Sequence, residues 1–247
     1  MGTVLTQPRV LWRLLRGQPG HSSLARRLQS FYAPQAEHYD RTRASLLHGR
    51  RLLADLVDLE PGQVLVELGA GTGANLDFFG PAIDRCREVH LVDLCGPLLA
   101  IARQRAASRP VVRVIEADAV TYRPERPVDV VVLSYALTMI PDWFRALDNA
   151  LGMLAPGGRI AVADFHVSRR EPPAGLRRQS VFTRHFWPLW FGHDGVRPNP
   201  DHLPYLMARF ETSVLVEQAG AIPGLPFLRM PYYVFVGRKP RYRKWPR

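Results

Sequence analysis

The sequence predicts an α/β protein with a mostly parallel, doubly wound sheet of seven strands. Short and almost entirely apolar segments, such as 64–68 and 128–133, are typical of strands buried on both faces. They alternate with stretches in which apolar residues recur at helical spacing, as in repeated strand–helix–strand units. A glycine-rich turn directly after segment 64–68 is a further sign of this fold class.

Each element follows from local signals. A helix is expected over 41–59, where leucines recur at helical spacing until Pro61-Gly62 ends it. The expected strands are 64–68, 89–93, 111–115, 128–133, 159–165, 213–217 and 232–237. The expected helices between them are about 74–79, from Pro97 to Ala106, and 142–154, the last ended by Pro156-Gly157-Gly158.

The chain lacks internal repeats and any linker long enough to divide it, so one domain is expected over 1–240. Its expected parts are a helical lid and acceptor segment at 1–59, a cofactor-binding core at 60–165, a lid insertion at 166–210, final strands at 211–240 and a basic tail at 241–247. The insertion is rich in aromatic residues and arginine and is too long for a simple connector. It forms either a substrate lid or helices that cover the sheet.

The glycine turn predicts a nucleoside site. Gly69, Gly71 and Gly73 let the backbone approach a ligand closely, and Asp93 at the end of the next strand can accept ribose hydroxyls. The pattern allows NAD, but its details favour S-adenosylmethionine (SAM). Glu67 just before the turn would repel a pyrophosphate and suits a cationic cofactor. A turn that merely packs a helix on the sheet is the alternative, and Asp93 argues against it.

Binding roles follow from these positions. The glycines shape the turn under the amino-acid part of SAM, and Glu67 lies near its ammonium. Asp93 accepts the ribose hydroxyls, and Asp118 meets the adenine amino group beside the Ala119 amide. Each acid could instead be an exposed charge at a strand end. The full expected cofactor set is Glu67, Gly69, Ala70, Gly71, Gly73, Asp93, Leu94, Asp118, Ala119 and Ser134. No metal is expected, because the sulfonium already activates the methyl group.

Charge and composition limit the classes of partner that the protein could bind. The net charge of +11 indicates either solubility or an anionic partner, which would be nucleic acid or a phospholipid surface. No RNA-binding module is recognisable, and no apolar run reaches the roughly 18–20 residues that span a bilayer. The first 36 residues hold five arginines and no acid, like a transit peptide or a basic amphipathic helix at 10–16. Cys86 and Cys95 lack metal spacing and are expected to be core thiols in a reducing compartment.

The order of elements over 60–165 resembles class I SAM-dependent methyltransferases. Over roughly 10–240 the chain is similar to the methyltransferase component of betaine-lipid synthesis. The motifs that carry this similarity are Phe31-Tyr32, Gln35-Ala36, Tyr39-Asp40, Arg43, Leu46-Leu47, Gly49-Arg50, Asn75-Leu76-Asp77, Asp93-Leu94-Cys95, Ser134-Tyr135, Leu137-Thr138-Met139-Ile140-Pro141, Asp164-Phe165 and Pro231-Tyr232-Tyr233-Val234.

The resemblance implies three successive methylations of the amino group of diacylglyceryl-homoserine, which give the betaine lipid diacylglyceryl-trimethylhomoserine. It implies that a separate enzyme forms the homoserine ether lipid. It also favours an uncleaved amino terminus, a cytoplasmic location at the inner face of the cytoplasmic membrane, peripheral contact with anionic lipid, and no nucleic-acid partner.

The acceptor pocket is expected above strand 128–133, at Ser134 and Tyr135, with the amino-terminal segment closing over it. The candidate catalytic residues are Tyr39, Tyr32, Tyr135 and His166. Tyrosine hydroxyls can orient an amine, and tyrosine rings attract its developing positive charge. His166 is either a base or an ordinary surface or core residue. Arg43 or Arg184 could pair with the homoserine carboxylate, although Arg43 could equally form a helix ion pair.

Two other functions stay open. One is a SAM-dependent N- or O-methyltransferase of a soluble small molecule. The other is an inactive SAM-fold scaffold that binds a membrane or a protein; the intact glycine turn and Asp93 argue against it.

Overall fold

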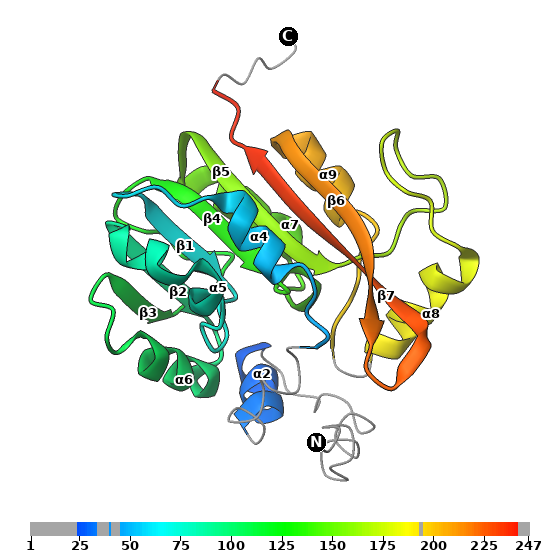
Figure 1. The fold of residues 1–247 in the computed structure, drawn as a ribbon, viewed down its shortest axis with the longest axis horizontal. Coiled ribbons are helices and arrows are strands. Elements are labelled where there is room, and N and C mark those ends of the chain that lie inside the picture. The colour runs from blue at the N-terminus through cyan, green and yellow to red at the C-terminus, as the bar shows by residue number, and fades with distance from the viewer. Residues whose placement is uncertain (1–23, 34–39, 41–44, 193–194, 242–247) are drawn as a thin grey trace.

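The computed structural model describes residues 24–33, 40, 45–192 and 195–241, and a seven-stranded sheet forms its centre (Figure 1). The strand order is β3-β2-β1-β4-β5-β7-β6. The strands are β1 (Val64–Leu68), β2 (Glu88–Asp93), β3 (Val112–Glu116), β4 (Val128–Ser134), β5 (Leu154–Phe165), β6 (Glu211–Ile222) and β7 (Leu225–Arg238). The first five are parallel, and β7 runs antiparallel between β5 and β6. The predicted fold class is confirmed.

Helices cover both faces of the sheet (Figure 1). One face packs against α4 (Arg50–Val57), α5 (Asn75–Phe79) and α6 (Gly96–Ala106). The other packs against α7 (Trp143–Met153) and α9 (His202–Arg209). The side chains of β4 divide between the two layers: Val130 and Val132 face the first, while Val131 and Leu133 face the second. All four are fully buried, which explains why this strand is apolar throughout.

Two further helices lie away from these layers. Helix α2 (Leu24–Tyr32) packs on the loop after β2 and on α6, near the carboxyl ends of the parallel strands. Helix α8 (Val181–Gly192) lies beside the far end of the β6–β7 hairpin (Figure 1). Short 3-10 helices occur at Gly80–Arg85 and Leu137–Met139. Cys86 and Cys95 are buried and free, as predicted for core thiols.

The helix expected over 41–59 is shorter where the structure describes it. Helix α4 begins after Gly49, which has a φ of +79°. A side chain at Gly49 would put its Cβ 2.7 Å from the Tyr232 ring, so the glycine lets the chain turn close against β7. Leu46 and Leu47 therefore precede the helix and do not share its apolar face. Residues 41–44 lie outside the described part of the chain.

The carboxyl-terminal half differs from the predicted boundaries in three places. Pro156-Gly157-Gly158, expected to form a turn, lies inside β5. The last two strands are longer than expected, because residues 219–222 and 225–231 continue the β6–β7 ladder beyond the edge of the main sheet. In the insertion at 166–210, α9 covers one face of the sheet, as in the second alternative, and α8 packs at the end of the hairpin.

Candidate active site

The glycine turn after β1 forms the floor of a cleft. Its backbone is in the left-handed region at Gly69 (φ +75°) and Gly71 (φ +56°). The amides of Gly69 and Ala70 donate to the Val92 carbonyl at 2.8 and 3.0 Å, which holds the turn against the end of β2. A Cβ at Gly69 would lie 2.5 Å from the Cβ of Ala136. Both the φ angle and this close approach therefore require glycine.

Gly73 differs from the other two glycines of the turn. Its φ is +68°, but it does not line the cleft. A Cβ there would meet the side chains of Leu91 at 3.0 Å and Ala102 at 3.4 Å. Gly73 thus shapes the turn and lets α6 pack on β2, and its expected place under the cofactor stays a prediction.

The remaining expected cofactor residues come together in one cleft at the carboxyl ends of β1, β2 and β4. The residues that line it are Leu28, Tyr32, Asp40, Leu47, Arg50, Glu67, Gly69, Ala70, Gly71, Thr72, Asp93, Leu94, Cys95, Leu98, Ala117, Asp118, Ala119, Ser134, Tyr135, Ala136, Met139 and Ile140. This edge is where open α/β sheets bind ligands.

Asp93 is fixed in the cleft by backbone donors. Its Oδ2 accepts from the Gly71 amide and its Oδ1 from the Cys95 amide, both at 2.8 Å. Burial raises its pKa, and these bonds oppose the shift. A carboxylate has about four acceptor positions, so Asp93 keeps acceptor capacity for two hydroxyls. Asp118 is held in the same manner, because its Oδ1 accepts from the Val120 amide at 2.8 Å.

Glu67 is a buried acid whose carboxylate accepts a hydrogen bond from the side chain of Asn75. Asn75 donates from Nδ2 to Glu67 Oε1 at 2.5 Å, and Arg50 donates from Nε to Asn75 Oδ1 at 2.7 Å. Burial raises the pKa of Glu67 from 4.5 to about 7, and the bond from Asn75 opposes the shift. A buried carboxylate at the floor of a cleft attracts a cationic ligand.

Binding of SAM is expected to release a proton near neutral pH. The pKa of Glu67 in the folded protein lies above its ordinary value, so its ionisation destabilises the free protein as pH rises from about 4.5 to 7. A nearby cation lowers that pKa, while Arg50 on α4, Asp93 on β2 and Arg105 on α6 stay in place. The affinity for SAM should therefore increase with pH across about 6 to 8.

Calorimetry in two buffers of different ionisation enthalpy measures the released proton, and Glu67→Gln should abolish this release. Proton release unchanged in Glu67→Gln would assign it to another group.

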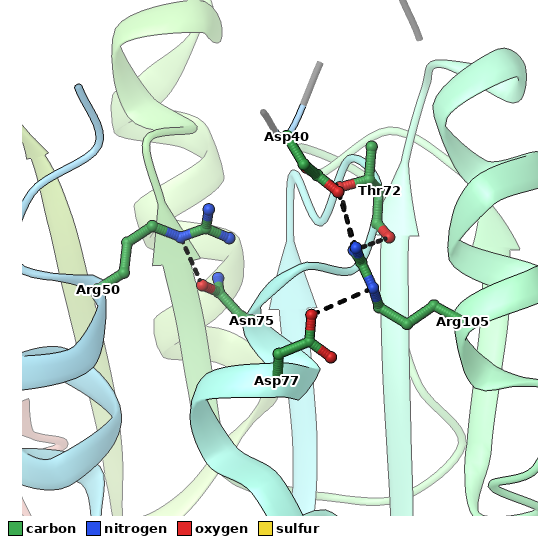
Figure 2. Close-up of polar contacts among 6 residues, drawn as sticks. All are labelled: Asp40, Arg50, Thr72, Asn75, Asp77 and Arg105. Atoms are coloured by element: carbon green, nitrogen blue, oxygen red, sulfur yellow. Dashed lines mark hydrogen bonds and ion pairs between the residues drawn. The ribbon is translucent and has the colours of Figure 1, made fainter. Parts of the chain in front are cut away.

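A second polar cluster ties the amino-terminal segment to the glycine turn, as Figure 2 shows. Asp40 accepts from the Thr72 hydroxyl at 2.7 Å and from Arg105 at 2.8 Å. Arg105 on α6 also donates to the Thr72 carbonyl at 2.8 Å and lies 3.4 Å from Asp77. The sequence singled out Asp40 in a motif, but no spacing indicated a partner 65 residues further along the chain.

Tyr135 lines the cleft directly after β4. Its φ is +56°, a strained backbone conformation of the kind that occurs at functional sites. Its hydroxyl donates to the His48 carbonyl at 2.5 Å, so toward a ligand this hydroxyl can act only as an acceptor. Tyr32, from α2, is buried and lines the same cleft. Ser134 also lines it. Tyr39 and Arg43 lie outside the described residues.

His166 is not brought to the cleft, and its expected role as a base there is wrong. The His166 amide donates to the Pro231 carbonyl and so extends the pairing of β5 with β7. Its side chain is buried against the Tyr233 ring, and its Nε2 lies 3.0 Å from a Glu217 carboxylate oxygen. His166 is a core residue. Arg184, on α8, does not line the cleft either.

Metal ligands are not gathered anywhere in the described part of the chain, where no three His, Cys, Asp or Glu side chains could share an ion. Across residues 24–33, 45–192 and 195–241, no helix is long and apolar enough to span a bilayer.

Comparison with known proteins agrees with the fold and the cleft. Residues 66–160 match the family model described as "Methyltransferase domain". The chain is a class I SAM-dependent methyltransferase in its fold and enzyme class. Its acids and glycine turn fit this cofactor, because they provide acceptors for ribose and a buried anion for a cation.

Particular relatives extend this comparison. The chain is 27% identical over 221 residues to the 2-phytyl-1,4-naphtoquinone methyltransferase of Thermosynechococcus vestitus, covering 85% of this chain and 94% of that one. It is 34% identical over 131 residues to the demethylmenaquinone methyltransferase of Thermus thermophilus, covering 52% and 57%. The N-methyltransferase NodS from Bradyrhizobium japonicum WM9, solved with S-adenosyl-L-homocysteine, superposes with a TM-score of 0.64 at 17% identity over 86% of this chain and 98% of NodS.

Proposed function

We propose that the protein methylates the amino group of diacylglyceryl-homoserine three times in succession to give diacylglyceryl-trimethylhomoserine. One observation carries this proposal. Motifs that resemble the betaine-lipid family, although distant in sequence, meet around the same cleft. Leu47, Arg50 and Tyr135 line this cleft. Tyr232 stacks at 5.7 Å on His48, whose carbonyl accepts the Tyr135 hydroxyl.

The cofactor, when bound, would supply an electrophilic methyl group. Asp93 and Glu67 would hold the cofactor in the cleft, and this positioning would favour the transfer. The rings of Tyr32 and Tyr135 line the same cleft, and each good cation–π contact with the amine contributes about 0.5–2 kcal/mol. An aromatic wall tolerates an amine that gains methyl groups between turnovers. A fixed hydrogen-bond donor does not, since each methylation changes the amine that it would contact.

Arg50 is the described arginine best placed for the homoserine carboxylate. It is half-buried, lines the cleft and uses its Nε to bind Asn75, which orients the guanidinium. The guanidinium carbon lies 5.0 Å from the centre of the Phe78 ring. A guanidinium presents a rigid pair of donors to a carboxylate. We therefore assign this role to Arg50 in place of Arg184.

A second candidate is ring methylation of a membrane quinone. It is favoured by the activities of the two relatives compared above, a phytyl-naphthoquinone and a demethylmenaquinone methyltransferase. Both candidates place the reacting group on a lipid-soluble acceptor. They differ in the nucleophile, which is an amine nitrogen in one and a ring carbon in the other.

Given SAM and diacylglyceryl-homoserine in detergent, the enzyme is expected to produce mono-, di- and trimethyl lipids in that order. Mass spectrometry of a time course measures them. Arg50→Met should raise the KM for this lipid by about tenfold or more. The Kd for SAM should change less than this KM, although Arg50 also orients Asn75 on Glu67. Arg51→Met is the matched control, because Arg51 does not line the cleft.

An enzyme that is inactive on the homoserine lipid but methylates a demethylated quinone would contradict the proposal and favour the second candidate. Rapid methylation of soluble amines in the absence of lipid would support the small-molecule alternative instead.

A further inference from the structure

Exposed apolar side chains gather at one end of the molecule. Seven large apolar residues are exposed in the described chain, and six of these lie on α8 or at the end of the β6–β7 hairpin. The six, here called the apolar tip, are Val181, Phe182, Leu189, Trp190, Leu225 and Phe227. Leu189 is 75% exposed and Phe227 is 99% exposed. Single exposed apolar residues are ordinary, but a contiguous group marks an interaction surface.

The two parts of the apolar tip are held together by a shared core. On α8, Trp187 and Phe191 are buried against Ile222 and Met230 of the hairpin. Figure 1 shows α8 beside the end of this hairpin. Helix α8 is thus apolar on its inner face and again on its outer face, where Leu189 and Trp190 lie. A helix that is apolar on both faces needs a second apolar surface to cover it.

The surroundings of the apolar tip are basic. Arg177 and Arg178 precede α8, Arg184 lies on it, and Arg229 lies on the hairpin. Arg177, Arg178 and Arg229 are exposed. The acid near them, Glu217, already pairs with His166 and the Arg177 amide. Tryptophan and phenylalanine flanked by arginine are typical of surfaces that enter the interface of an anionic bilayer.

Charge argues against two other occupants. A second copy of the chain, with its net charge of +11, would bring the same arginines face to face. The first 23 residues contain three arginines and no acid, so they too would meet a like-charged rim.

We propose that the apolar tip inserts into the interface of an anionic phospholipid bilayer. The inference deepens the proposed function and rests on its lipid-borne acceptor. Aromatic rings connect the tip to the cleft: Phe191 stacks on Phe165 at 4.4 Å, and Phe165 packs edge-on against Tyr135 at 4.7 Å. If the acyl chains of the lipid stay in the bilayer, these apolar side chains would lie between the membrane and the amine that reacts in the cleft.

The test is sedimentation with vesicles of phosphatidylcholine alone or mixed with phosphatidylglycerol, both free of any acceptor lipid. The wild type should bind the mixed vesicles, less well at high salt. Leu189→Glu combined with Trp190→Glu should weaken this binding about tenfold or more. Phe144→Glu is the matched control, since Phe144 on α7 is the remaining exposed large apolar residue and should change binding less than about twofold.

Equal vesicle binding by the double variant and the Phe144→Glu control would overturn the inference. Failure of the wild type to bind anionic vesicles would also overturn it. Loss of binding on removal of residues 1–23, with the double variant unaffected, would assign the membrane contact to that segment instead. Activity on a water-soluble, short-chain homoserine ether separates the two proposals. Failure of the wild type on this acceptor counts against the proposed function, whereas vesicle binding tests the tip alone.

Discussion

Asp93→Ala should weaken SAM binding by about 100-fold or more, which calorimetry measures directly. The carboxylate lies at the end of β2, where we expect it to accept the two ribose hydroxyls. Hydrogen bonds to a charged group contribute about 1.5–3 kcal/mol each, and 1.4 kcal/mol is tenfold in affinity. No other side chain of the cleft is expected to replace these bonds, because Glu67 and Asp118 face other parts of the cofactor.

Two variants serve as controls for Asp93→Ala. The carboxylate also accepts from the amides of Gly71 and Cys95, so its removal leaves buried donors unpaired. Asp93→Asn keeps one acceptor and separates this loss from loss of the cofactor bonds. Glu116→Ala removes the acid paired with Asp93 in the β2–β3 register and should bind SAM normally, because Glu116 does not line the cleft. Wild-type affinity in a folded Asp93→Ala protein would refute the ribose assignment.

Gly69→Ala should destabilise the protein by about 2–5 kcal/mol and also impair SAM binding. An L-residue in the left-handed region costs about 1–2 kcal/mol, and an overpacked contact adds about 1–3 kcal/mol. The overpacked contact is with Ala136, because the new Cβ would lie 2.5 Å from its Cβ. Unfolding in urea, followed by circular dichroism, gives the free energy.

Gly62→Ala is the matched control for Gly69→Ala. Gly62 has almost the same φ, +80°, but no atom lies within 4 Å of a Cβ built there. The Gly62→Ala substitution should therefore lower the free energy of unfolding only by the cost of the left-handed backbone, about 1–2 kcal/mol. If the two variants lose the same free energy, the approach of Ala136 does not constrain Gly69.

The sequence predicted those features that depend on neighbouring residues. The apolar run at 128–133 identified a strand buried on both faces, and the spacing from the glycine turn to Asp93 located the cofactor cleft. Gly69 and Gly73 looked equivalent in sequence, yet they differ in the structure. Gly69 is required by the approach of Ala136, which follows β4. At Gly73 the nearest neighbours are instead Leu91 on β2 and Ala102 on α6. The tertiary structure determines which element approaches a glycine, so the local sequence does not predict it.

Long-range pairs explain most of what sequence analysis missed. His166 follows β5 and looked free to act at the site, but Glu217, distant in sequence, holds it in the core. The packing of α8 was equally hard to predict, because its aromatic residues fit either a lid or a helix that covers the sheet. Burial of Trp187 beside exposed Trp190 distinguishes the two sides of that helix. Helical spacing alone does not say which side meets protein.

The contact of Asp40 with Thr72 and Arg105 (Figure 2) has a thermodynamic consequence. One carboxylate holds the residues before β1 and the turn that holds the cofactor, so the free energies of ordering these two parts are linked. Linkage is reciprocal. If a bound cofactor strengthens the contact of Asp40 with Thr72 by some factor, that contact strengthens cofactor binding by the same factor. Loss of the contact would then weaken cofactor binding by that factor.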